Sequence, residues 1–307
     1  MKTDLAAAAQ LACLLEASAP KPGNVSPGRH FDDVRYEHFL ASAAAIGEPL
    51  GAAGSQPLGR TIRLATEATA QWTPSNTNLG IVLLLAPVAR AALSEQDSPP
   101  LFPAHDRRAG SGFVLAELRQ AVRRVLEATT VDDAREVYAA IRLAAPGGLG
   151  RTPEQDVAGE PTMPLLEVMR LAADRDGIAR EYATGFETTF ETAVPALERA
   201  RRDRLSWDDA IVETFLTLLA AAPDTHVTRR GGPVLASEIS GRAKATIDTG
   251  GVRSAAGRRA IDAMDHWLRD PRHLSNPGTT ADLTAAALFV VLLRGGWSSG
   301  GSDAARR

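Results

Sequence analysis

Apolar residues recur along almost the whole chain at spacings of three and four positions, the pattern of amphipathic helices. No run of alternating apolar and polar residues bounded by hairpin turns stands out, so strands are not expected. The pattern predicts an all-α protein of about twelve helices. They are expected at residues 3–18, 33–47, 58–72, 77–95, 111–128, 131–144, 162–175, 177–202, 207–221, 233–248, 253–269 and 279–294.

Several predicted helices begin at residues that cap a helix N-terminus well. Thr130 and Ser206 each precede a helical stretch and have an aspartate three positions later, an arrangement close to a capping box. Asp32 or Asp33 is expected to cap the helix that follows them. These local signals agree with the helical periodicity and support the all-α prediction.

Clusters of proline and glycine separate the predicted helices, as in residues 146–150 and 276–278. None of them is long enough for a linker between domains. Residues 1–297 are therefore predicted to form one all-helical catalytic domain, with 298–307 as a flexible tail. The stretch 97–110 is expected to be the most mobile loop.

Composition and charge narrow the classes of function. The 307 residues carry 34 basic and 37 acidic side chains, which leaves no electrostatic footprint for a nucleic-acid binder. The single cysteine, Cys13, excludes a disulfide scaffold and a cysteine-based zinc site. The N-terminus lacks the features of a signal peptide, and the most apolar stretches fall short of the ~20 residues of a membrane span. We expect a cytoplasmic protein that binds neither nucleic acid nor membranes.

Lysine is rare in this chain, since only Lys2, Lys21 and Lys244 are lysines among the 34 basic residues. Arginine is used at nearly all positions where any surface cation would suffice. A retained lysine is therefore a candidate for a role that needs a compact ammonium group. Lys21 lies between two prolines in Pro20-Lys21-Pro22-Gly23. A segment this stiff would present the ammonium group to a phosphate.

The same loop continues to His30 and Asp32. An imidazole and a carboxylate two positions apart suit an acid–base pair or a shared metal ion. The simpler interpretation is a turn between helices in which Asp32 is only a cap.

A second polar loop, with Asn76, Thr77 and Asn78, leads through Leu79 and Gly80 into an apolar helix. One cap would need fewer polar side chains than this. The amide, hydroxyl and free backbone N–H groups at such a helix start suit an anion or a sugar hydroxyl. Helix capping alone is the equal alternative.

Two further loops combine charge with glycine. Asp224-Thr225-His226 is followed by Arg229-Arg230-Gly231-Gly232, which suits a charged substrate but also a solvated loop. In Pro277-Gly278-Thr279-Thr280-Ala281-Asp282, the aspartate would repel a phosphate bound at the helix start unless a divalent cation lay between them. Magnesium bridging the carboxylate and phosphates would resolve that conflict, and capping alone explains the loop equally well.

Taken in order, these loops resemble the triphosphoribosyl-dephospho-CoA synthase family, which makes the prosthetic-group precursor of citrate and malonate lyase or decarboxylase complexes. The matching pieces are Glu16 with Pro20-Lys21-Pro22-Gly23, Gly28-x-His30-x-Asp32, Asn76-Thr77-x-x-Gly80, Asp224-Thr225 with Arg230-Gly231-Gly232, and Pro277-Gly278-x-x-Ala281-Asp282-Leu283. The resemblance implies an all-helical enzyme that transfers the triphosphoribosyl part of ATP to the 2′-hydroxyl of dephospho-CoA and releases adenine. The oligomeric state is left open, with a homodimer as one option.

The implied reaction assigns roles to these residues. Asp32 and Asp282 would stabilise oxocarbenium character at the ribose, and His30 would take the proton of the acceptor hydroxyl. Magnesium would bind Asp282 and Asp224 next to the triphosphate. Contacts to ATP are predicted from Lys21, Gly23, Asn76, Thr77, Gly80, Arg230, Gly231 and Thr279.

One motif departs from the family pattern. The family usually has Asn-Thr-His-Lys-Gly, whereas Asn78 and Leu79 stand here in place of the histidine and lysine. His226 is a candidate to supply an imidazole from another loop. The segments 146–156 and 172–176 resemble a divergent branch found in archaea and one-carbon-metabolising bacteria.

Three alternatives to transfer onto dephospho-CoA therefore remain open. The first is a divergent homologue that acts on another acceptor in one-carbon cofactor biosynthesis, of the tetrahydromethanopterin or methanofuran type. The second is a helical metal-dependent phosphohydrolase, which His105-Asp106 suggests. The third is a non-catalytic nucleotide-binding protein.

Overall fold

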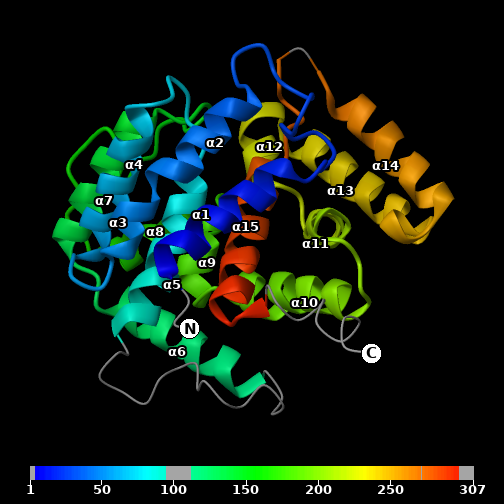
Figure 1. Cartoon of the computed structure of the whole chain (residues 1–307). Helices are drawn as coiled ribbons and strands as arrows, with labels where there is room; N and C mark the ends of the chain where they lie inside the picture. Colours follow the sequence, from blue (N-terminus) through cyan, green and yellow to red (C-terminus); the bar gives the residue numbers. More distant parts are fainter. Residues whose placement is uncertain (1–3, 95–111, 271, 297–307) are drawn as a thin grey trace, which may run out of the picture.

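The helical periodicity of the sequence is realised throughout the part of the chain that the structure describes. The computed structural model describes residues 4–94, 112–270 and 272–296. Those residues form helices and no strand, with one isolated bridge between Ser26 and Arg29 (Figure 1). The all-α prediction is confirmed.

The helices follow one another along the chain with short connections. In the first half they are α1 (Leu5–Ser18), α2 (Tyr36–Ala45), α3 (Gly47–Gly51), α4 (Leu58–Ala70), α5 (Leu79–Ser94), α6 (Gly112–Glu127) and α7 (Val131–Ala144). In the second half they are α8 (Leu165–Ala172), α9 (Gly177–Thr184), the π-helical η1 (Thr188–Ala193), α10 (Val194–Arg202), α11 (Trp207–Ala221), α12 (Thr225–Gly231), α13 (Pro233–Asp248), the 3₁₀ turn η2 (Gly251–Arg253), α14 (Ala255–Leu268) and α15 (Gly278–Leu293).

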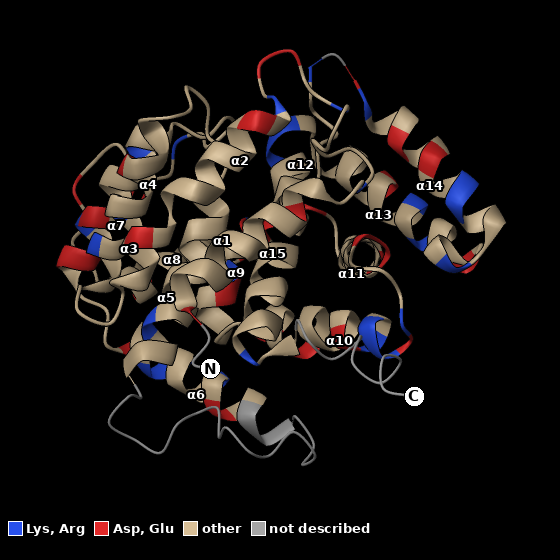
Figure 2. Cartoon of the chain, viewed as in Figure 1, with Lys and Arg blue, Asp and Glu red and all other residues tan. Residues whose placement is uncertain are grey.

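Two helices, α5 and α15, are apolar around nearly their whole circumference. A helix without a polar face must be covered on all sides. In α15 almost every residue from Thr279 to Leu293 is buried, and α5 is buried over most of its length. Consistent with this, α15 contacts α1, α5, α9, α10, α11, α12 and η1. It runs through the centre of the molecule, while charged side chains gather on the outer helices (Figures 1 and 2).

Local capping explains where several helices begin. Thr130 Oγ1 accepts from the backbone N–H of Asp133 at 3.2 Å, and Ser206 Oγ accepts from that of Asp209 at 3.1 Å, as the sequence predicts. The expected cap at Asp32 or Asp33 is wrong. Helix α2 begins later, at Tyr36, and the preceding residue, Arg35, occupies the N-cap position.

Two stretches differ from the sequence prediction in their secondary structure. The single helix expected over 177–202 is divided, because Gly185 and Phe186 adopt left-handed backbone angles, with φ of 64° and 60°, that end α9. The stretch after Asp224, expected as a loop, is the short helix α12 with Asp224 as its N-cap. That change matters for the site, because it orients His226 and Arg229 from a helix.

Three predictions fall on residues that the structure does not describe, namely the mobile loop 97–110, the pair His105-Asp106 and the tail 298–307. Among the helices of the described residues, none has the length and apolar character needed to span a bilayer.

Candidate active site

A cleft of about 640 Å³ opens between α5, α7, α8, α9, α12 and the start of α15. Its volume lies in the ordinary range for small-molecule sites, about 300–1,000 Å³. Helices α5, α7, α8 and α9 contribute apolar lining residues, namely Leu83, Val137, Tyr138, Ile141, Leu165, Val168, Met169 and Ile178. Polar and charged residues line the cleft as well, among them Asn76, Asp176, His226, Arg229, Thr279 and Asp282. The cleft thus combines apolar and charged lining residues.

Asp282 lies where α15 crosses α5, against Gly80. A Cβ atom built on Gly80 would lie 2.0 Å from Asp282 Oδ2, so only glycine permits this approach of the two helices. Within the described residues, Asp282 forms no hydrogen bond or ion pair. Burial raises its pKa well above the ordinary value, the nearby carboxylates of Glu16, Asp224 and Asp176 raise it further, and the charge of Arg229 only partly opposes the increase. A carboxyl group with a strongly raised pKa in a cleft indicates a functional site.

Asp224 connects the N-termini of α12 and α15. Its Oδ1 accepts from the backbone N–H of Val227 at 3.0 Å, and its Oδ2 accepts from the N–H and hydroxyl of Thr280, both at 2.7 Å. Burial raises the pKa of Asp224, and these hydrogen bonds oppose the increase. Both carboxylate oxygens, predicted to bind magnesium, are thus already used as hydrogen-bond acceptors between two helices.

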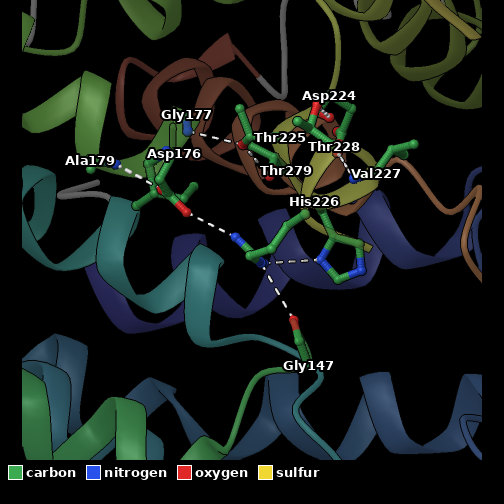
Figure 3. Close-up of polar contacts among 12 residues, drawn as sticks. Gly147, Asp176, Gly177, Ala179, Asp224, Thr225, His226, Val227, Thr228 and Thr279 are labelled. Atoms are coloured by element: carbon green, nitrogen blue, oxygen red, sulfur yellow. Dashed lines mark hydrogen bonds and ion pairs between the residues drawn. The ribbon is translucent and has the colours of Figure 1, made fainter. Parts of the chain in front are cut away.

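A chain of polar contacts links α9 to α12 along the cleft (Figure 3). Asp176 Oδ1 caps α9 by accepting from Ile178 and Ala179, and its Oδ2 forms an ion pair with Arg229 Nη1 at 2.9 Å. Arg229 Nη2 lies 3.4 Å from Nδ1 of His226. The guanidinium group also donates from Nε to the carbonyl oxygen of Gly147 at 3.4 Å, which ties the segment after α7 to α12. The imidazole is therefore held in place by an arginine that is itself held by a carboxylate.

His226 is a neutral imidazole at physiological pH. Burial lowers its pKa to about 4, and the positive charges of Arg229 and Arg230 lower it in the same direction. Its Nε2 atom is buried and has no hydrogen-bond partner among the described residues. The ring lines both the cleft and a smaller neighbouring cavity that also contains Asp282 and Gly80. Asn78 and Leu79 line that smaller cavity as well, so an imidazole is present close to where the family motif would place its histidine.

Lys21 differs from its predicted orientation. Instead of projecting from a stiff loop, it is buried, and its Nζ forms an ion pair with Glu16 Oε1 at 2.9 Å and donates to the carbonyl oxygen of Ala19 at 3.3 Å. A buried ammonium group needs such a counter-charge. Gly23, with φ of 79°, donates its N–H to Asp265 Oδ1 at 2.9 Å, which fixes the loop against α14.

His30 and Asp32 are exposed, and neither lines the cleft or the smaller cavity. Nδ1 of His30 accepts from the backbone N–H of Tyr36 at 3.3 Å, where it supports the start of α2. The structure therefore does not bring this predicted acid–base pair to Asp282.

The other predicted ligand-binding residues divide between the cleft and its surroundings. Asn76 lines the cleft and caps α5, its Oδ1 accepting from the N–H of Leu79 at 3.1 Å. Thr279 also lines the cleft and shares a hydrogen bond of 3.1 Å with Thr225 (Figure 3). Thr77 lines the smaller cavity and is hydrogen-bonded to the hydroxyl of Ser42.

Arg230 and Gly231 lie at the end of α12, outside the cleft lining. Arg230 is exposed and donates to the carbonyl oxygen of Arg272 at 3.3 Å. A Cβ on Gly231 would lie 2.5 Å from Leu235 Cδ2, which accounts for glycine there through packing.

Sequence reasoning did not select Asp176, Arg142, Arg151 or Arg175 as site residues. Asp176-Gly177 stands directly before a predicted helix, so the sequence signalled a helix cap and not a site. Arg142, Arg151 and Arg175 also line the cleft, and in a chain this rich in arginine nothing local distinguishes them.

No group of three or more histidine, cysteine, aspartate or glutamate side chains within the described residues is arranged to hold a metal ion. Magnesium bound with a nucleotide needs fewer, because it is commonly held by one or two carboxylates together with phosphate oxygens and water. Asp282, whose oxygens have no hydrogen bond from a described residue, fits such an ion, whereas the oxygens of Asp224 are already used.

Comparison with known proteins gives a consistent result. The model of the ATP:dephospho-CoA triphosphoribosyl transferase family matches residues 2–300. Similar proteins include probable 2-(5''-triphosphoribosyl)-3'-dephosphocoenzyme-A synthases from Pseudomonas syringae pv. tomato, 34% identical over 113 residues, and from Pseudomonas putida, 36% identical over 116 residues. These matches cover 36% and 37% of this chain and only 38% and 40% of the relatives' own length.

A solved structure extends the likeness over most of the fold. A crystal structure described as that of a candidate triphosphoribosyl-dephospho-CoA synthase from Archaeoglobus fulgidus has 26% sequence identity and a TM-score of 0.60. The alignment covers 83% of this chain and 99% of the other.

Proposed function

The chain belongs to the ATP:dephospho-CoA triphosphoribosyl transferase family, and from that premise we propose that it transfers the triphosphoribosyl group of ATP to a nucleotide acceptor such as dephospho-CoA. In this reaction the bond between C1′ of the ribose and the adenine nitrogen breaks, and a new bond forms from C1′ to an acceptor hydroxyl oxygen. Adenine leaves with the electron pair of the broken bond and gains a proton, while the hydroxyl loses one. The observation that carries the proposal is the unpaired Asp282 in a nucleotide-sized cleft.

Asp282 is the group that suits the reacting centre. Its negative charge would stabilise the positive charge that develops at C1′ as the glycosidic bond lengthens. Because its pKa is raised, the carboxylate is also a stronger base than an ordinary aspartate, and it suits the acceptor's hydroxyl proton. We assign it both roles in place of His30 and Asp32, which lie outside the cleft lining.

The triphosphate would lie along the arginine-bearing margin of the cleft. Arg142, Arg151 and Arg175 line it and are exposed. Guanidinium groups bind phosphate oxygens through paired hydrogen bonds. This role passes to them from Lys21, whose ammonium group is already paired with Glu16. Magnesium bound to the phosphate oxygens would neutralise negative charge there.

The apolar wall formed by α7 and α8 suits the adenine base or the apolar part of the acceptor. Such a wall excludes water, and this protects an oxocarbenium-like centre from hydrolysis. The exposed Leu149 and Leu171 extend the wall to the rim of the cleft, where a long acceptor would leave it.

The decisive test is to incubate the protein with ATP, magnesium and dephospho-CoA and to follow free adenine by chromatography. We expect adenine in amounts equal to the acceptor consumed, and none with the Asp282→Asn variant. Release of inorganic phosphate without adenine would instead identify a phosphohydrolase. Tight binding of ATP with neither product would identify a non-catalytic nucleotide-binding protein.

A second candidate function is the same transfer to a different acceptor. The observation that favours it is Leu79, which is buried and lines the cleft where the family motif has a lysine. A missing cation there would suit an acceptor with one anionic group fewer. Adenine release that depends on an acceptor other than dephospho-CoA, in one-carbon cofactor biosynthesis for example, would establish this alternative.

A further inference from the structure

A second cavity of about 110 Å³ adjoins the cleft and shares with it the lining residues Asn76, Leu79, Gly80, His226 and Asp282. Its volume is three to four times the roughly 30 Å³ that one water molecule occupies in the liquid. Sites for whole small molecules are larger, at about 300–1,000 Å³. The small cavity therefore suits a compact group that belongs to a ligand bound mainly in the cleft.

Two residues that line this cavity each have a buried polar atom with no hydrogen-bond partner among the described residues. One is Oδ1 of Asn24, a residue only 6% exposed, whose Nδ2 donates to Asn276 Oδ1 at 2.5 Å. The other is Nε2 of His226. A buried polar atom left without a partner costs about 1–3 kcal/mol. Two of them on one small cavity indicate that a polar group fills it when the site is occupied.

The two atoms have complementary hydrogen-bonding roles. Arg229 Nη2 lies 3.4 Å from Nδ1 of His226, and a guanidinium group can only donate. Nδ1 is thus the acceptor, and the ring proton is on Nε2, which is an unpartnered donor. Oδ1 of Asn24 is an unpartnered acceptor. A pair of hydroxyl groups, each able to donate and accept, satisfies both atoms.

The charge on the cavity wall excludes an anionic group. Asp282 lines the cavity without an ion pair among the described residues, and its pKa is raised although the charge of Arg229 opposes the increase. Glu16 lines the cavity too, and its charge is balanced by Lys21. A phosphate would meet the unbalanced carboxylate at short range, whereas neutral hydroxyl groups could donate to it.

We propose that this cavity is a subsite for the vicinal hydroxyl groups of a nucleotide ribose, with Asn24 as acceptor and His226 as donor. The proposal rests on the proposed function, because that reaction brings two ribose rings to one site. The ribose belongs to the donor nucleotide or to the acceptor nucleotide, and their 2′- and 3′-hydroxyl groups have the same chemistry.

The test measures equilibrium binding without turnover. ATP, 2′-deoxy-ATP and 3′-deoxy-ATP are titrated separately into the protein with no acceptor present, and dephospho-CoA and its 2′- and 3′-deoxy analogues are titrated without ATP. For the nucleotide whose ribose enters the cavity, we expect the wild-type protein to bind the full diol about 10- to 100-fold more tightly than a deoxy analogue. The nucleotide that binds more tightly than its deoxy analogue is the one whose ribose enters the cavity.

Two variants test the assigned atoms. Asn24→Leu removes the acceptor at similar volume and should bring the affinity ratio close to one. His226→Gln keeps an N–H near the Nε2 position and should retain most of the discrimination, whereas His226→Met should lose it. Thr66→Val is the matched control, because this buried hydroxyl on α4 is bonded within its own helix to Ile62 and lies outside both cavities.

The outcomes separate this proposal from the proposed function. If ATP and dephospho-CoA bind but neither is distinguished from its deoxy analogues, the cavity holds only water and the subsite is refuted, while transferase activity stands. If His226→Met keeps the discrimination even where Asn24→Leu fails to fold, the subsite is also refuted. If neither nucleotide binds, both proposals fail together.

Discussion

At the scale of single residues, Asp282 is the side chain on which the site depends. Its carboxyl group is buried against Gly80, next to other carboxylates, without a compensating partner among the described residues. Such an arrangement is unfavourable for folding, because the charged form is desolvated and repelled. A protein retains it where a ligand supplies the missing partner.

Replacing Asp282 with asparagine should therefore abolish activity and raise stability. The pKa of Asp282 is raised in the folded state, so ionisation destabilises the fold at neutral pH but not below the unfolded pKa of about 4. We expect Asp282→Asn to raise the melting temperature at pH 7.5, by roughly 2–4 °C for each kcal/mol relieved, and to have little effect at pH 4. Adenine release should fall by at least about 100-fold.

Asp209 provides the control of opposite sign. The hydrogen bond from Arg258 lowers the pKa of Asp209, so its ionised form stabilises the fold. Asp209→Asn should lower the melting temperature at pH 7.5 and leave adenine release unchanged. Differential scanning calorimetry at both pH values measures the melting temperatures that distinguish the two variants. A lower melting temperature for Asp282→Asn than for the wild type at pH 7.5 would contradict the assignment of Asp282 as an unpaired carboxylate.

Lys21 and Asp282 also show what a sequence motif can and cannot predict about a site. The motif predicted a phosphate contact at Lys21 and a catalytic and magnesium-binding role for Asp282, whereas the structure buries Lys21 and leaves Asp282 without a hydrogen bond or ion pair among the described residues. Their orientation could not be predicted, because Glu16 and Lys21 meet only once α1 has formed and the chain has turned at the prolines. His30 and Asp32, the predicted acid–base pair, lie outside the cleft lining. Their position also depends on how the chain turns after α1, which the local sequence does not determine.

At the scale of helices, the crossing of α5 over α15 is the feature that builds the site. It requires that position 80 have no side chain, since a Cβ there would overlap the Asp282 carboxyl group at 2.0 Å. Alanine is otherwise favoured over glycine inside a helix by about 1 kcal/mol. The glycine is thus explained by the site and not by the helix.

Gly80→Ala should destabilise the protein by about 1–3 kcal/mol through overpacking and should displace the Asp282 carboxyl group, with loss of adenine release. The same substitution in an Asp282→Ala background should be neutral or stabilising, because the overlapping group is gone. Gly241→Ala on α13, where an added Cβ meets nothing within 4 Å, is the control and should stabilise in either background. A purely additive double-mutant cycle by urea unfolding would contradict this account.

Helix boundaries were largely predictable because capping is local. Thr130, Ser206 and the range 131–144 were found from neighbouring residues alone. The segment 224–231 was not predicted as a helix, although Asp224 caps it locally at Val227, because only seven residues follow the cap. Short helices stabilised by tertiary contacts carry little periodic signal.

At the scale of the whole molecule, the polar network around α12 connects the site to global stability. The all-α class followed from the chain's periodicity, but the cleft did not, because it is formed by helices from both halves of the sequence. His226 lines the cleft, and its pKa is lowered to about 4 by burial and by the charges of Arg229 and Arg230. Any loss of the native packing would restore its ordinary pKa.

This linkage predicts how unfolding depends on pH. The unfolded chain takes up a proton on His226 near pH 6.5, and the folded protein takes it up only near pH 4, so stability decreases as pH falls through that window. The full contribution of this residue is about 3 kcal/mol, complete above pH 7 and lost near pH 4. Asp282 and Asp224 act in the opposite direction, because their raised pKa values favour the folded state at low pH.

The contribution of His226 must therefore be isolated by comparing the wild type with His226→Gln in urea unfolding at pH 7.5 and 4.5. We expect the wild type to lose stability relative to the variant as the pH falls. A difference that stays constant between the two pH values would show that His226 titrates normally in the folded protein and is exposed to solvent.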